Sequence, residues 1–160
     1  MPFVFFAAAG SLIWGALAAA NAYKVTRFLA YASINQMGFM LLGASADTFD
    51  ALRATYIYLF LYAVMTGGFM LAYLHVRRED GNALIHISDF GGLARTEASV
   101  CWSLAVYLFS MAGIPPLAGF FSKYYVLNAV LARGVTVLVI IGLIVSLISA
   151  YYYLRIIATF

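Results

Sequence analysis

The feature that most constrains the fold is a series of continuous apolar runs separated by short polar connections. The runs lie at about 3–20, 28–45, 54–75, 98–132 and 134–154. About 20 apolar residues are enough for a helix to cross the hydrocarbon core of a bilayer. The runs do not alternate apolar and polar residues as the strands of a membrane β-barrel do. The sequence therefore predicts an all-α membrane bundle of about five transmembrane helices in one domain, 1–160.

Composition supports this prediction and excludes several functions. Hydrophobic residues make up 66% of the chain and charged residues 9%, which a soluble domain of this length could not keep in solution. The small basic excess lies in the connections, so it indicates topology and not a nucleic-acid partner. The single cysteine, Cys101, excludes an internal disulfide. There is no phosphate-binding glycine loop and no metal-ligand cluster, so we expect no redox chemistry, cofactor or metal in this chain.

The fourth run is too long for one straight span and contains the helix-breaking sequence GIPPLAG. Its breakers are Gly113, Pro115, Pro116 and Gly119. The run is either two spans joined by a tight turn or one discontinuous span that is unwound near 113–119.

Positive charge, which collects on the side that is not translocated, does not choose between the two arrangements. One broken span places six basic residues against two: Lys24, Arg27, Arg77, Arg78, Arg95 and Arg155 against Arg53 and Arg133. Two spans exchange Arg133 with Arg155, and the count is unchanged. Both arrangements place the connections 21–27 and 76–97 on the cytoplasmic or matrix side, and 76–97 is the one long polar loop.

Lys123 lies inside this run, where an ammonium in hydrocarbon costs at least about 2.5–3.5 kcal/mol. It lies eight residues before Leu131, about 12 Å of helix, which is too far for its stem to reach the surface from an unbroken helix. A break at GIPPLAG frees carbonyls and amides that can line a hydrated pocket around it. We therefore predict that Lys123 transfers protons or ions, with a structural salt-bridged lysine as the alternative.

Two further groups of polar residues lie in the apolar runs. The group in the second run is Ser33, Asn35 and Gln36, and the group in the third is Tyr58, Tyr62 and Thr66, four residues apart on one helical face. Their hydroxyls and amides could hold water along a proton path, although helix packing explains both groups as well. Tyr151, Tyr152 and Tyr153, followed by Arg155, predict an interfacial anchor at the end of the last run.

Three stretches together resemble a known family. SMAGIPPLAGFFSKYYVL, TRFLAYASINQMGFMLLG and AYYYLRII are similar to the antiporter-like membrane subunits of respiratory complex I, in particular the NADH dehydrogenase subunit 2 family. With the spans between them, these matches cover nearly the whole chain. The resemblance implies a five-helix antiporter-like repeat whose discontinuous helix, broken at GIPP, carries Lys123. It therefore favours one broken span.

The same resemblance implies a C-terminal fragment of subunit 2, which couples NADH:ubiquinone oxidoreduction to proton pumping. Flavin, iron–sulfur clusters and quinone would lie in other subunits. The expected partners are other membrane-arm subunits, a separate chain supplying the N-terminal half of the subunit, and lipids. The expected location is the mitochondrial inner membrane, with the bacterial plasma membrane as the alternative.

The chain also departs from the family. The first repeat, with its glutamate and lysine, is absent, and Tyr62 and Thr66 lie on a span where many members carry His or Lys. Two other functions therefore stay open: a structural membrane-arm subunit without proton transfer, and a fragment of a cation/proton antiporter.

Overall fold

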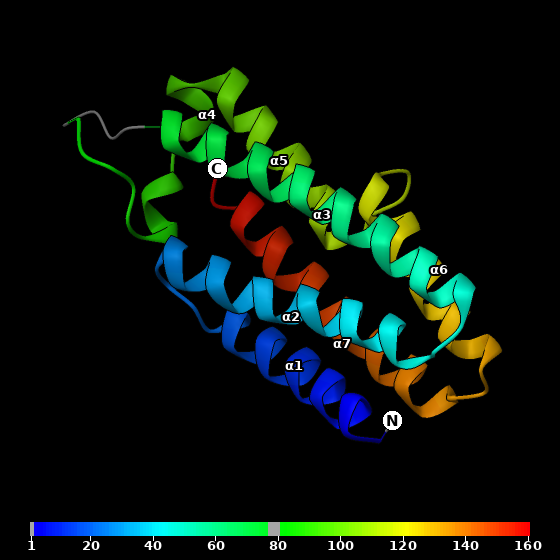
Figure 1. Cartoon of the computed structure of the whole chain (residues 1–160). Coiled ribbons are helices and arrows are strands. Elements are labelled where there is room, and N and C mark those ends of the chain that lie inside the picture. The colour runs from blue at the N-terminus through cyan, green and yellow to red at the C-terminus, as the bar shows by residue number, and fades with distance from the viewer. Residues whose placement is uncertain (1, 77–80) are drawn as a thin grey trace.

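A computed structural model describes residues 2–76 and 81–160, and in this part of the chain its regular elements are helices, joined by turns and loops with one isolated β-bridge between Lys24 and His86. Six long helices form the bundle in Figure 1: α1 (Pro2–Ala20), α2 (Val25–Ser45), α3 (Phe49–His75), α5 (Ala98–Ala112), α6 (Ala118–Ala132) and α7 (Thr136–Ile157). A 3-10 turn, η1 (Ile87–Phe90), and a short helix, α4 (Leu93–Thr96), lie between α3 and α5. The predicted all-α fold is confirmed. By length and composition, α1, α3 and α7 each suffice to cross a membrane.

The fourth apolar run forms two helices with a break between them. α5 ends where Gly113 adopts the left-handed conformation, with φ of 82°, which a residue without a side chain adopts at little cost. The amides of Gly113 and Ile114 donate to the carbonyls of Ser110 and Phe109, which closes the end of the helix. Helix α6 begins at Ala118, beyond the two prolines.

Helices α5 and α6 follow one another along α3, as Figure 1 shows, and both contact it. Each has 15 residues, or about 22 Å of helix, which is less than the roughly 30 Å thickness of the hydrocarbon core. α3 has 27 residues, or about 40 Å, and extends beside both. The pair α5–α6 therefore makes one passage through the bundle.

Two arginines lie at opposite ends of α7. Arg155 Nη1 donates to the Ala20 carbonyl at 3.0 Å, at the end of the bundle where α1 meets α2. Arg133, at the other end of α7, lines a pocket together with Arg53. One broken span predicts that Arg133 lies on the same side as Arg53 and that Arg155 lies on the opposite side, as found here, whereas a two-span hairpin predicts the reverse. Arg77 and Arg78, which the same charge count used, lie outside the described residues.

The polar loop 76–97 packs against the start of α2 in its described part, 81–97. The amide of Val25 donates to the Ile85 carbonyl at 3.0 Å, and the amide of Ile87 donates to the Tyr23 carbonyl at 2.9 Å. Phe90 is buried beneath the loop. These bonds attach the loop to the same end of the bundle as Arg155.

Candidate functional site

The break between α5 and α6 brings two stretches of backbone into contact. A Cβ atom on Gly119 would lie 1.7 Å from the Ser110 carbonyl oxygen, so only glycine fits at this position. The amide of Gly119 donates to Ser110 Oγ at 3.3 Å, and the Ser110 hydroxyl also contacts Met65 Sδ. The first turn of α6 is therefore held directly against the last turn of α5.

Lys123 lies one turn further along α6, and its side chain turns back toward the break. Nζ donates to the carbonyl oxygens of Met111 at 3.2 Å and Ala112 at 3.3 Å. These carbonyls belong to the last turn of α5, the negative end of that helix dipole, which favours a cation. The side chain is 4% exposed, and no carboxylate among the described residues pairs with it.

An aromatic ring covers another side of the lysine. Nζ lies 5.3 Å from the centroid of the Phe39 ring, within the range of a cation–π contact. The Phe39 ring in turn stacks on Tyr58 at 6.2 Å between centroids. Phe39 is fully buried, so this contact forms away from water, where such contacts are strongest.

Gln36 joins the lysine site to a group of buried hydroxyls. Its Nε2 donates to the same Met111 carbonyl at 3.5 Å and to Tyr153 OH at 3.3 Å, while its Oε1 accepts from Tyr58 OH. Lys123 and Gln36 therefore share one acceptor. Because a carbonyl and an amide do not titrate at ordinary pH, this route orients the lysine but cannot pass its proton on.

The other predicted polar residues fall into separate groups. Asn35 Nδ2 donates to Tyr152 OH at 3.0 Å, and its Oδ1 is buried without a hydrogen-bond partner in the described part of the chain. Tyr62 OH donates to Ser33 Oγ at 2.9 Å, and neither residue bonds to Gln36 or Lys123. Thr66 Oγ1 is buried and has no partner among the described residues. Continuity from Thr66 to Lys123 is not formed by direct hydrogen bonds.

The interfacial anchor predicted for the tyrosines of α7 is wrong for two of the three. Tyr152 and Tyr153 are 2% and 1% exposed, and they lie in the core as partners of Asn35 and Gln36. Only Tyr151, at 63% exposed, lies on the surface. Two buried amides that need partners were the signal that could have located these hydroxyls, because buried polar groups are nearly always hydrogen-bonded.

A groove of about 620 Å³ opens beside Lys123 between α6 and α7. Its polar lining comes from Lys123, Tyr124, Asn128 and Ser146, and most of its other walls are apolar. The groove touches Gly113, Ile114 and Pro115 at the break, so the lysine stem forms part of its wall. The groove therefore touches the lysine on a side away from the tyrosine group.

Comparison with known proteins identifies the family. The sequence matches the family described as NADH:quinone oxidoreductase/Mrp antiporter, transmembrane, over residues 1–149. It is 41% identical over 154 residues to NADH-quinone oxidoreductase subunit N of Parvibaculum lavamentivorans, covering 96% of this chain and 32% of that protein. It is 42% identical over 151 residues to NADH-ubiquinone oxidoreductase chain 2 of Marchantia polymorpha, covering 94% and 30%. The chain thus spans about a third of the length of these relatives.

Solved structures give the same result. A chain of respiratory complex I from Thermus thermophilus with bound aureothin superposes with a TM-score of 0.80 at 27% identity, covering 99% of this chain and 35% of that one. A chain of the Mrp complex from Dietzia sp. gives 0.89 at 25% identity, covering 98% and 29%. The expected resemblance is therefore confirmed, and this chain belongs to the NADH:quinone oxidoreductase/Mrp antiporter transmembrane family.

Proposed function

We propose that this chain forms part of the proton-translocating, antiporter-like subunit of an NADH:quinone oxidoreductase, in which Lys123 takes up and releases the proton. The observation that carries this proposal is the position of Lys123. It is a buried amine with no carboxylate partner in the described residues, bound to carbonyls at a helix break. Membership of the family and the likeness to subunit N support the same function.

The geometry suggests how the break serves proton transfer. The carbonyls of Met111 and Ala112 and the Phe39 ring stabilise the charged ammonium in its present position. A small rotation of α6 about Gly113 would withdraw Nζ from the carbonyls toward the groove, where the amine can release its proton to water. The energy for that movement would come from electron transfer elsewhere in the complex. Ser33, Asn35, Gln36, Tyr58, Tyr62 and Thr66 would bind water or orient the lysine beside this path.

The proposal includes the surroundings of the chain. The rest of the subunit, including the N-terminal half predicted to lie on a separate chain, would complete the path with the other membrane-arm subunits. Flavin, iron–sulfur clusters and quinone would act in other subunits of the complex. The membrane would be the mitochondrial inner membrane or the bacterial plasma membrane, and the similar proteins include a bacterial subunit N and a chain 2 of Marchantia polymorpha.

The test is Lys123→Met in the assembled complex. We expect near-normal assembly and a loss of most proton pumping per NADH oxidised, measured in proteoliposomes with a pH-sensitive dye. Lys24→Met is the matched control, because Lys24 is an exposed lysine at the start of α2. Unchanged pumping by an assembled Lys123→Met complex would reject the proton-transfer function and leave a structural subunit.

A cation/proton antiporter is the second candidate, and the TM-score of 0.89 with a chain of the Mrp complex favours it. The two candidate functions predict different copurifying proteins. A subunit of the oxidoreductase copurifies in mild detergent with flavin and iron–sulfur proteins and with NADH oxidation. An antiporter fragment copurifies with neither and moves protons in response to a cation gradient.

A further inference from the structure

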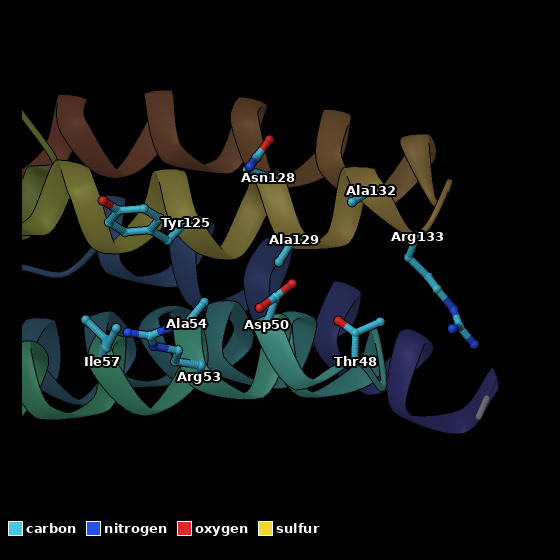
Figure 2. Close-up of a pocket in the computed structure, with 10 residues that line it drawn as sticks. All are labelled: Thr48, Asp50, Arg53, Ala54, Ile57, Tyr125, Asn128, Ala129, Ala132 and Arg133. Atoms are coloured by element: carbon cyan, nitrogen blue, oxygen red, sulfur yellow. The ribbon is translucent and has the colours of Figure 1, made fainter.

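A second pocket lies at the end of the bundle opposite to the polar loop, between the start of α3 and the end of α6. It has a volume of about 680 Å³, within the usual range for ligand sites. Figure 2 shows its lining. The polar residues are Thr48, Asp50, Arg53, Tyr125, Asn128 and Arg133. Apart from Asn128, which also lines the groove beside Lys123, the function proposed above uses none of them.

The charges in this pocket have opposite signs and no partners. Asp50, Arg53 and Arg133 are exposed, and none of them forms an ion pair within the described ranges 2–76 and 81–160. Figure 2 shows the Asp50 carboxylate directed across the pocket toward α6, with Arg53 on one side of it and Arg133 at the opposite end. A complementary ligand therefore carries both an anionic group and a cationic group.

The depth of the pocket matches the headgroup layer of a bilayer. Arg53 lies four residues inside the first residue of α3, or about 6 Å of helix. The headgroup region on each face of a bilayer is about 5–7 Å thick. Phe49 is 81% exposed beside the pocket and Tyr125 is 51% exposed, as is typical of aromatic side chains at a membrane interface. Further from the charges the wall combines the apolar residues Ala54, Ile57 and Ala129 with Tyr125 and Asn128.

We propose that this pocket binds a phospholipid whose headgroup carries both a phosphate and a primary ammonium. The phosphate lies against Arg53, because a guanidinium can donate two parallel hydrogen bonds to phosphate oxygens, and Arg133 at the opposite end of the pocket adds to the positive potential. The ammonium lies against Asp50, and an acyl chain follows the apolar wall. The Asp50 carboxylate gives selectivity, since a quaternary choline has no N–H to donate and a glycerol headgroup has no positive charge.

The experiment measures lipids retained by the assembled complex. The complex is exchanged into vesicles containing equal amounts of phosphatidylethanolamine, phosphatidylcholine and phosphatidylglycerol with identical acyl chains. A photoreactive residue at Ile57, which lines the pocket, captures the bound lipid for mass spectrometry. We expect phosphatidylethanolamine to be captured at least about tenfold above the other two, which corresponds to roughly 1.4 kcal/mol of selectivity.

Two kinds of variant distinguish the role of the arginines from the role of Asp50. Arg53→Gln and Arg133→Gln should reduce capture of all three lipids, whereas Asp50→Asn should retain capture and lose the preference over phosphatidylcholine. Arg95→Gln is the matched control, because Arg95 is an exposed arginine on the polar loop. Millimolar inorganic phosphate should not displace the lipid.

Several outcomes would overturn the proposal. They are equal capture of the three lipids, an Asp50→Asn variant that keeps the preference, and displacement by inorganic phosphate, which indicates a free-anion site. Cross-linking of Ile57 to a polypeptide would show that another part of the complex fills the pocket. The result is independent of proton transfer, because Lys123→Met should capture lipid as the wild type does.

Discussion

Gly119→Ala tests whether contact between α5 and α6 is what positions Lys123. The added methyl would lie 1.7 Å from the Ser110 carbonyl oxygen, whereas ordinary contact begins at 3.4 Å. The two backbones must therefore separate by about 1.7 Å, since no side chain can rotate away to relieve the overlap. Nζ of Lys123, now 3.2 Å from the Met111 carbonyl, would then lie beyond hydrogen-bonding distance.

The expected size of the effect follows from the lost bonds. A hydrogen bond to a charged group contributes about 1.5–3 kcal/mol, so losing one reduces the population of carbonyl-bound lysine about ten- to a hundredfold. The overlap itself should destabilise the subunit by about 1–3 kcal/mol. We expect a similar loss of proton pumping per NADH oxidised, measured in proteoliposomes against the quantity of assembled complex on native gels.

Gly67→Ala is the control for this measurement. Gly67 lies in α3, and a Cβ atom there would meet nothing within 4 Å. This variant adds the same methyl group to a membrane helix without an overlap, so pumping and assembly should match the wild type. If Gly119→Ala pumps as well as Gly67→Ala, the contact at the break does not position the lysine and the reasoning fails.

Two further predictions concern the residues around the lysine. Gln36→Leu removes the partner of the Tyr58 and Tyr153 hydroxyls, at about 1–3 kcal/mol for each buried group left unpaired, and should lower the thermal inactivation temperature of the complex. Met37→Leu, at an exposed neighbouring position, should not, and equal temperatures for the two variants would contradict the hydrogen bonds described for Gln36. Phe39→Leu removes a contact worth about 0.5–2 kcal/mol with Lys123, so its effect on stability should largely disappear in a Lys123→Met background. An undiminished effect there would show that Phe39 acts by packing alone.

The sequence was sufficient to single out several residues that the structure brings together at the helix break. Lys123 is an ionisable group in an apolar run, and Pro115 and Pro116 cannot continue a helix, so each carries its own signal. Gln36 is equally conspicuous. The positions of Tyr152 and Tyr153 were misassigned, because three consecutive tyrosines before an arginine are also typical of an interfacial anchor. The buried small residues Gly142 and Ser149 lie on the same face of α7 as these two tyrosines.

The distribution of basic residues could not show whether the fourth run makes one passage or two, for another reason. Arg133 and Arg155 lie at opposite ends of α7, so exchanging them leaves the count of basic residues on each side unchanged. A contact that places Arg155 at one end of the bundle distinguishes the two arrangements, and the hydrogen bond from Arg155 to the Ala20 carbonyl is such a contact. The sequence also could not predict that Lys123 binds the Met111 carbonyl. Every residue has a backbone carbonyl, and only the fold determines which one the lysine contacts.

That carbonyl limits how the site can work. It accepts from both Lys123 Nζ and Gln36 Nε2, so the lysine and the tyrosine group are attached to the same point on α5. A proton cannot pass through it, because neither the carbonyl nor the amide beyond it can take up and release a proton at ordinary pH. Under the proposed function, protons would therefore reach Lys123 from another side, and the groove between α6 and α7 is a cavity that touches the lysine. On this reasoning Gln36 lies outside the proton path, and a Gln36→Leu complex that still assembles should keep pumping, whereas a bulky residue at Ser146 in the groove should stop it.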